Sequence, residues 1–110
     1  MKDQRIYLQH IIECIGWIEE YTSTGRDQFL TSRMAQDATL RQLQVMAEST
    51  QRISADLKDQ YPEVDWRALS GFRNVLVHNY LGVDMDEVYS AIQMHLPALK
   101  AAVESMLSTL

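Results

Sequence analysis

Apolar residues recur at intervals of three and four along most of the chain, which places them on one face of an α-helix. We expect the first helix over residues 3–22 and, after a polar break, a second long helix over residues 27–58, bent or split near residues 48–50. The apolar positions of the first helix are Tyr7, Leu8, Ile11, Cys14, Ile15 and Ile18. Those of the second are Phe29, Leu30, Met34, Ala38, Leu43, Met46, Ile53 and Leu57.

A proline and two aspartates mark the expected helix boundaries in the second half of the chain. Pro62 ends the second helix, because the residue before a proline resists helical backbone geometry. Asp65 is well placed to cap a third helix, and Gly82 supplies a stop signal beyond it. The expected buried stripe of this third helix is Trp66, Leu69, Phe72 and Leu76.

Asp84 caps a fourth helix that we expect to reach the end of the sequence, with one continuous apolar seam. Its members are Met85, Val88, Ile92, Leu96, Leu99, Val103, Met106 and Leu110. Pro97 lacks an amide donor and crowds the carbonyl four residues earlier, so we expect a kink or a split there. No segment alternates with a two-residue period long enough for a strand. The sequence therefore predicts one all-α domain, residues 1–110, built as a bundle of four or five helices.

The charge balance excludes one broad class of nucleic-acid binder. Ten basic and fifteen acidic residues give a formal net charge of -5, so the chain does not coat nucleic acid through a general positive field. Seven of the ten basic residues nevertheless lie between residues 26 and 73. Any contact with RNA must therefore be local, and the central helices are where a basic cleft could form.

Cysteine usage and hydropathy indicate the compartment. Cys14 is the only cysteine, which excludes an intrachain disulfide and favours a reducing environment. No run approaches the ~20 apolar residues of a membrane span, and none resembles a signal peptide. We expect a soluble, cytoplasmic protein. His10 has only Glu13 at metal-ligand spacing and His95 has no such partner, so we expect no metal and no cofactor.

The residues best suited to catalysis lie between positions 73 and 80, in the pattern R-N-x-x-x-H-x-Y. This pattern comprises Arg73, Asn74, His78 and Tyr80. An arginine can hold a phosphate, a histidine can move a proton near neutral pH, and a tyrosine carries a hydroxyl. Together they provide most of what phosphodiester cleavage without a metal requires.

The spacing of these residues poses a geometric problem. On an ideal helix, at ~100° per residue, Arg73 and Tyr80 share one face while His78 points about 140° away. The side chains can converge only if the helix ends near His78 or if a second copy of the motif completes the site. A twofold dimer would supply that copy, and with it a second histidine.

Several stretches resemble the HEPN-domain toxins of the HepT type, small bacterial ribonucleases that pair with a minimal nucleotidyltransferase antitoxin. The segment 65–84 is the most specific, since W-R precedes R-N-x-x-x-H-x-Y-x-G-V-D, and the likeness spans nearly the whole chain. The other stretches are 29–30, 38–43, 62–67 and 96–99. Residues 47–49 read Ala-Glu-Ser where the family usually has Gly-Glu-Ala, which keeps the glutamate, Glu48.

The resemblance implies a homodimer whose two third helices line a shared cleft. In it, Arg73 and His78 of both chains would cut cellular RNA without a metal, as the toxin of a type VII-like toxin–antitoxin system. Asn74 would orient the site or hydrogen-bond the RNA. The antitoxin would silence the enzyme by adenylylating Tyr80, which adds negative charge where an RNA phosphate must bind.

Other interpretations of the same residues remain open. Arg73 could form a surface ion pair, His78 could be a structural residue at a helix end, and Tyr80 could simply pack its ring. The protein could then be a catalytically inactive HEPN module that binds nucleotide or serves as the structural partner of a nucleotidyltransferase. It could also be a structural bundle in which the motif is incidental. Trp17 and Trp66 are expected in the core or an interface.

Overall fold

The computed structural model describes residues 3–110, which form six α-helices, one short 3-10 helix and no strand. Four of the helices are long, and the predicted all-α bundle is confirmed. The elements are α1 (Gln4–Thr22), α2 (Arg26–Thr31), α3 (Arg33–Thr50), α4 (Ala55–Asp59), α5 (Trp66–His78), η1 (Tyr80–Gly82) and α6 (Met85–Thr109).

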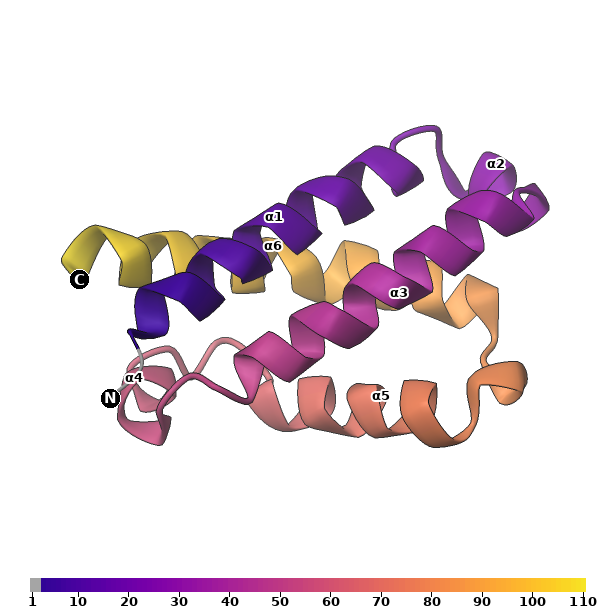
Figure 1. Ribbon diagram of the computed structural model, residues 1–110. Coiled ribbons are helices and arrows are strands. Elements are labelled where there is room, and N and C mark those ends of the chain that lie inside the picture. Colours follow the sequence, from indigo (N-terminus) through magenta and orange to yellow (C-terminus); the bar gives the residue numbers. More distant parts are fainter. Residues whose placement is uncertain (1–2) are drawn as a thin grey trace.

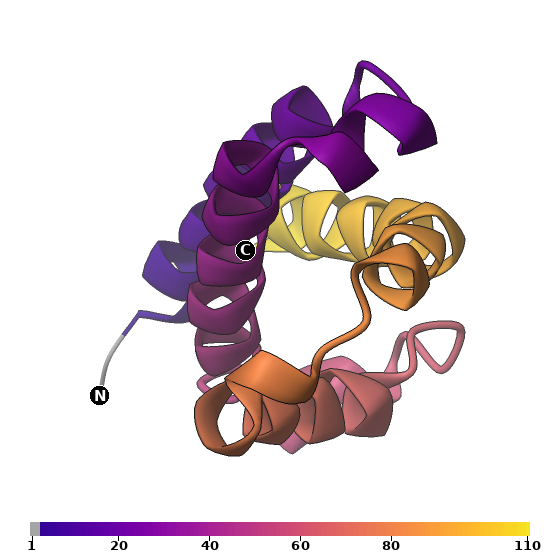
Figure 2. The same cartoon turned by 90° about the vertical axis from the view of Figure 1, so that its right-hand side faces the viewer.

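The four long helices run in alternating directions along the bundle (Figure 1). α1 lies against both α3 and α6, and the short α2 packs on the same two helices. α5 packs chiefly on α3, on the side away from α1 (Figures 1 and 2). The motif-bearing helix is therefore peripheral to the tightly packed group formed by α1, α3 and α6.

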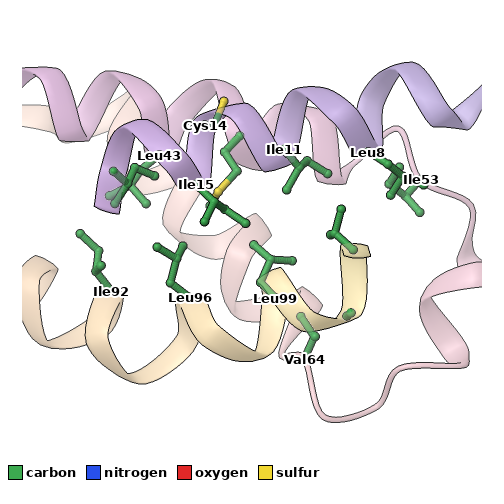
Figure 3. Close-up of a cluster of buried hydrophobic side chains, with 14 of the residues drawn as sticks. Leu8, Ile11, Cys14, Ile15, Leu43, Ile53, Val64, Ile92, Leu96 and Leu99 are labelled. Carbon is green, nitrogen blue, oxygen red and sulfur yellow. The ribbon is translucent and has the colours of Figure 1, made fainter. Parts of the chain in front are cut away.

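The core forms where the apolar faces of α1 and α6 meet (Figure 3). Leu8, Ile11 and Ile15 of α1 point toward the side of α6 that carries Leu96 and Leu99, and all five are less than a tenth exposed. Burying one such side chain contributes about 1.5–3 kcal/mol. The apolar stripes predicted for the first and fourth helices are thus confirmed along most of their length.

α6 does not split at Pro97, because the helix continues without a break from Met85 to Thr109. A proline inside a helix costs about 3 kcal/mol or more. Leu96, Leu99 and Val103, on either side of the proline, are all buried, and their packing offsets that loss.

The single helix predicted over residues 27–58 is wrong, because the chain breaks twice there. Ser32 has an extended backbone, and its Oγ accepts a hydrogen bond from the Ala35 amide at 3.1 Å, which caps α3. The Gln36 side chain donates hydrogen bonds at 3.0 Å to the carbonyls of Phe29 and Leu30 in the last turn of α2. The second break follows Thr50, where a bend or split was expected.

The third helix ends at His78, one of the two arrangements that the spacing of the motif left open, and Gly82 lies beyond its end. Asn79 leaves helical geometry, and η1 follows immediately. A Cβ at residue 82 would lie 2.7 Å from the Asn79 Nδ2 atom, so any larger residue would force that side chain to shift. Gly82 thus permits this close turn and does not act as the helix stop.

The buried stripe predicted for the third helix is only partly correct. Leu76 is buried, whereas Trp66, Leu69 and Phe72 are half-buried. The reason is a cavity of about 200 Å³ between α5 and the α3–α6 pair, lined by Leu69 and Phe72 among others. No helix within residues 3–110 is long and apolar enough to cross a membrane.

Candidate functional site

The motif occupies the second half of α5 and the turn that follows it. Arg73 and Asn74 lie in α5, His78 is its last residue, and Tyr80 begins η1. Arg73 is partly buried, whereas the other three are exposed. Among residues 3–110, no hydrogen bond or ion pair joins His78 to Arg73 or Tyr80. The helix does end at His78, yet a single chain does not bring His78 into contact with Arg73 or Tyr80.

Arg73 is held loosely between two neighbours. Its Nε atom lies 3.9 Å from the Glu48 Oε1 atom of α3, which is an ion-pair distance but too long for a hydrogen bond. The buried Nε–H accordingly has no hydrogen-bond partner. The Nη1 atom donates to the Asn74 Oδ1 atom at 3.3 Å. Glu48 and Asn74 therefore orient the guanidinium group and leave it donors for an anion.

His78 is exposed at the C-terminal end of α5. Its imidazole makes no hydrogen bond or ion pair within the described chain, unlike a histidine that completes a helix end. The ring nitrogens are therefore open to solvent and to a bound substrate. This exposure is what a proton-transfer group needs.

Tyr80 is anchored to α3 by its hydroxyl. The phenol donates a hydrogen bond to the Asp37 Oδ1 atom at 3.2 Å, and the Asp37 Oδ2 atom lies 3.4 Å from the Arg33 Nε atom. Partial burial, the Asp37 charge and this hydrogen bond raise the pKa of Tyr80, while Arg33 acts in the opposite direction. The phenol stays protonated at neutral pH and remains a donor.

Sequence reasoning did not find Asp37 or Arg33 as members of this site. The four-residue spacing between them is a signal for an ion pair on one helix face. Nothing in the sequence links that pair to Tyr80, because 43 residues separate Asp37 from Tyr80. Glu48 was singled out from the sequence, but its contact with Arg73 was not.

Exposed apolar side chains surround the motif. Val75 and Val77 lie on α5, and Leu81 of η1 is 96% exposed. Val75 and Val77 are two residues apart on α5 and so point in different directions, which leaves Leu81 as the most exposed apolar side chain of this region. All three lie next to Asn74, His78 and Tyr80 in the sequence, on the outer side of the bundle.

The remaining candidate groups do not form a second reactive centre. Burial, with a smaller effect of Glu13, raises the pKa of Cys14 to about 11, so the thiol is protonated and a poor nucleophile. The His10 Nδ1 atom lies 2.6 Å from the Ser49 Oγ atom, within hydrogen-bond distance. In the part of the chain that the structure covers, no three His, Cys, Asp or Glu residues could together hold a metal ion.

Comparison with known proteins identifies relatives over almost the entire sequence. The family model described as "Ribonuclease HepT-like" matches residues 11–106, a range that includes all four motif residues and confirms the resemblance noted above. A probable ribonuclease HepT of Thermococcus cleftensis is 32% identical over 106 residues, which are 96% of each chain. A putative RNase of Caldanaerobacter subterraneus is 28% identical over 108 residues, 97% of this chain and 96% of that protein.

A third relative is longer. It is a protein of Methanocaldococcus jannaschii described as a gamma-glutamylcyclotransferase and putative RNase, 32% identical over 110 residues. The alignment covers 99% of this chain but half of that relative. No solved structure matches the chain significantly.

Proposed function

Because the chain belongs to the family of HepT-like ribonucleases, we propose that it is a metal-independent endoribonuclease with Arg73 and His78 as catalytic residues. The observation that carries the proposal is an exposed imidazole without protein partners, five residues beyond a guanidinium group with unused donors. Both groups lie on the same outer helix. Asn74, which contacts Arg73, supports the arginine or binds RNA.

The proposed reaction is an in-line attack by a ribose 2'-hydroxyl on the adjacent phosphorus. A base removes the hydroxyl proton, and an acid protonates the departing 5'-oxygen. One motif supplies one histidine, so a second copy supplies the other role. The arginine holds the phosphate and stabilises the charge that develops in the transition state. Side chains thus provide every group that the reaction needs, without a metal.

A homodimer around α5 would assemble this site. Leu81 of η1, which is 96% exposed next to Tyr80, supplies an apolar side chain that such a dimer would bury. Twofold symmetry would place two copies of the motif opposite each other. The dimer accounts for both the exposure of Leu81 and the separation of His78 from Arg73 within one protomer.

Incubation of the purified protein with total RNA tests the enzymatic proposal. We expect cleavage in EDTA and in magnesium alike, measured as loss of full-length RNA on a denaturing gel. Cleavage only in magnesium would contradict metal independence. Intact RNA under both conditions would overturn the nuclease and favour the alternative, a helical module that binds nucleotide or serves as the structural partner of a nucleotidyltransferase.

We further assign the protein the toxin role in a type VII-like toxin–antitoxin pair, with a minimal nucleotidyltransferase as antitoxin and Tyr80 as the acceptor of AMP. Tyr80 is 41% exposed, and the hydrogen bond to Asp37 orients its phenol. In the modified form, the phenol oxygen bonds to the α-phosphorus of ATP, pyrophosphate leaves and the phenolic proton is released. The attached phosphate would repel an RNA phosphate near His78.

Intact-mass spectrometry after co-expression with a minimal nucleotidyltransferase tests this assignment. We expect the protein to gain the mass of one or more AMP groups, because the Tyr80 hydroxyl is accessible. Tyr80→Phe should abolish the gain, whereas Tyr21→Phe on α1 should leave it unchanged. A mass gain that persists in Tyr80→Phe, or its absence from the wild type, would contradict the assignment.

A further inference from the structure

A polar groove between α1 and α3 is unused by the function proposed so far. It has a volume of about 590 Å³, within the range of roughly 300–1,000 Å³ typical of ligand sites. We call it the α1–α3 groove. Its lining includes Trp17 from α1 together with Arg41, Gln42, Glu48 and Ser49 from α3, and Arg52 just beyond α3.

The groove adjoins the candidate catalytic arginine. Glu48 lines the groove and also lies 3.9 Å from the Arg73 Nε atom. The groove therefore reaches the carboxylate that pairs with the guanidinium group assigned to the reacting phosphate. Arg73 itself lines neither the groove nor the apolar cavity beneath α5, and Glu48 is its link to the groove.

The groove is more basic than the rest of the chain, because its arginines and glutamates balance while the chain as a whole is acidic. Arg41 and Arg52 line the groove and Arg73 stands next to it, against the two carboxylates of Glu13 and Glu48. The groove itself thus carries two arginines and two glutamates, whereas the chain as a whole has a net charge of -5. Arg41 of α3 and Arg52 just beyond its end are eleven residues apart, so they suit two separate phosphates of an extended strand better than a single ion.

An aromatic platform completes the groove. Trp17, expected in the core or an interface, is 50% exposed. Its ring stacks on Tyr21 with centroids 6.3 Å apart and an interplanar angle of 18°, which restrains the indole. An exposed, restrained indole beside arginines is the combination that binds unpaired bases by stacking.

We propose that the α1–α3 groove binds the single-stranded RNA that flanks the scissile phosphate. Arg41 and Arg52 contact its phosphates, and Trp17 stacks on a base. The inference rests on the proposed function, since it takes RNA as the substrate. It adds a binding track outside the motif and specifies unpaired RNA, because paired bases do not expose a face for stacking.

Binding is best measured without cleavage, in the His78→Ala background, by fluorescence anisotropy of a labelled single-stranded oligoribonucleotide. We expect Arg41→Gln, Arg52→Gln and Trp17→Ala each to raise Kd by about tenfold. The matched control is Arg67→Gln, an exposed arginine of α5 that does not line the groove, and it should leave Kd nearly unchanged. Circular dichroism verifies that every variant is folded.

The salt dependence separates the two kinds of contact. Each arginine variant should reduce the slope of log Kd against log salt by about 0.7, the value for one phosphate of a single strand, whereas Trp17→Ala should leave the slope intact. In the cleaving protein, the same variants should raise KM and leave kcat unchanged.

Three results would overturn the inference. Unchanged Kd in all groove variants would refute RNA binding in the α1–α3 groove. Loss of cleavage in His78→Ala would still support the proposed nuclease activity in that case. Equal weakening by Arg67→Gln would indicate a general charge effect. A shift of oligomeric state in Trp17→Ala without an effect on RNA binding would identify the groove as an interface between copies of the chain.

Discussion

His78→Ala is expected to reduce RNA cleavage by about a hundredfold to ten-thousandfold, the range associated with loss of a general acid or base. His78 is exposed and makes no hydrogen bond within the described residues, so its removal should not change stability or oligomeric state. Initial rates on a defined oligoribonucleotide, measured at matched protein concentrations, give the effect. His95→Ala, an exposed histidine of α6, is the control and should retain full activity.

Substitutions of Arg73 test the same catalytic assignment. Arg73→Ala should lose activity to a similar extent, and Arg73→Lys should recover only part of it, because lysine keeps the charge but lacks the planar fork that holds a phosphate. If His78→Ala and Arg73→Ala both cut RNA at the wild-type rate, the catalytic assignment is wrong, whatever the wild-type protein does in EDTA.

Leu81→Asp should dissociate the proposed dimer and abolish cleavage. Leu81 is 96% exposed in the single chain, so the substitution leaves the folded protomer unperturbed. In a dimer around α5 the same position would become buried, and an unpaired carboxylate there would weaken association by about 2 kcal/mol or more per protomer. Analytical ultracentrifugation and the cleavage assay should show both losses together.

Met94→Asp is the matched control for this second prediction. Met94 is an exposed apolar residue of α6, 73% accessible and distant in sequence from the motif. It should remain dimeric and active. An active wild-type monomer would contradict the dimeric site. So would a Leu81→Asp variant that stays dimeric and cleaves RNA at the wild-type rate.

Periodicity and caps predicted much of the fold from the sequence. The apolar spacings of α1 and α6 located the core, and the caps Asp65 and Asp84 located the starts of α5 and α6. The break at Ser32 was missed because the apolar pattern continues across it. Only the side-chain hydrogen bond to the Ala35 amide reveals that serine as a cap.

The candidate site was predictable in composition but not in arrangement. The spacing of Arg73 and His78 showed that a straight helix could not bring them together, and α5 does end at His78. The contact between Tyr80 and Asp37 depends on how α5 and η1 pack on α3, which no local pattern contains. The half-buried state of Phe72 likewise reflects the cavity between helices.

The protected state of Cys14 makes the protein well suited to spectroscopic labelling. Its sulfur is 1% exposed and its thiol is protonated at neutral pH, so alkylating reagents should leave it untouched. A cysteine introduced at position 94, which is 73% exposed and lies outside the proposed dimer contact, would be the sole accessible thiol of residues 3–110. A nitroxide attached there would report the separation of two protomers directly, by pulsed electron paramagnetic resonance, in solution and with RNA present.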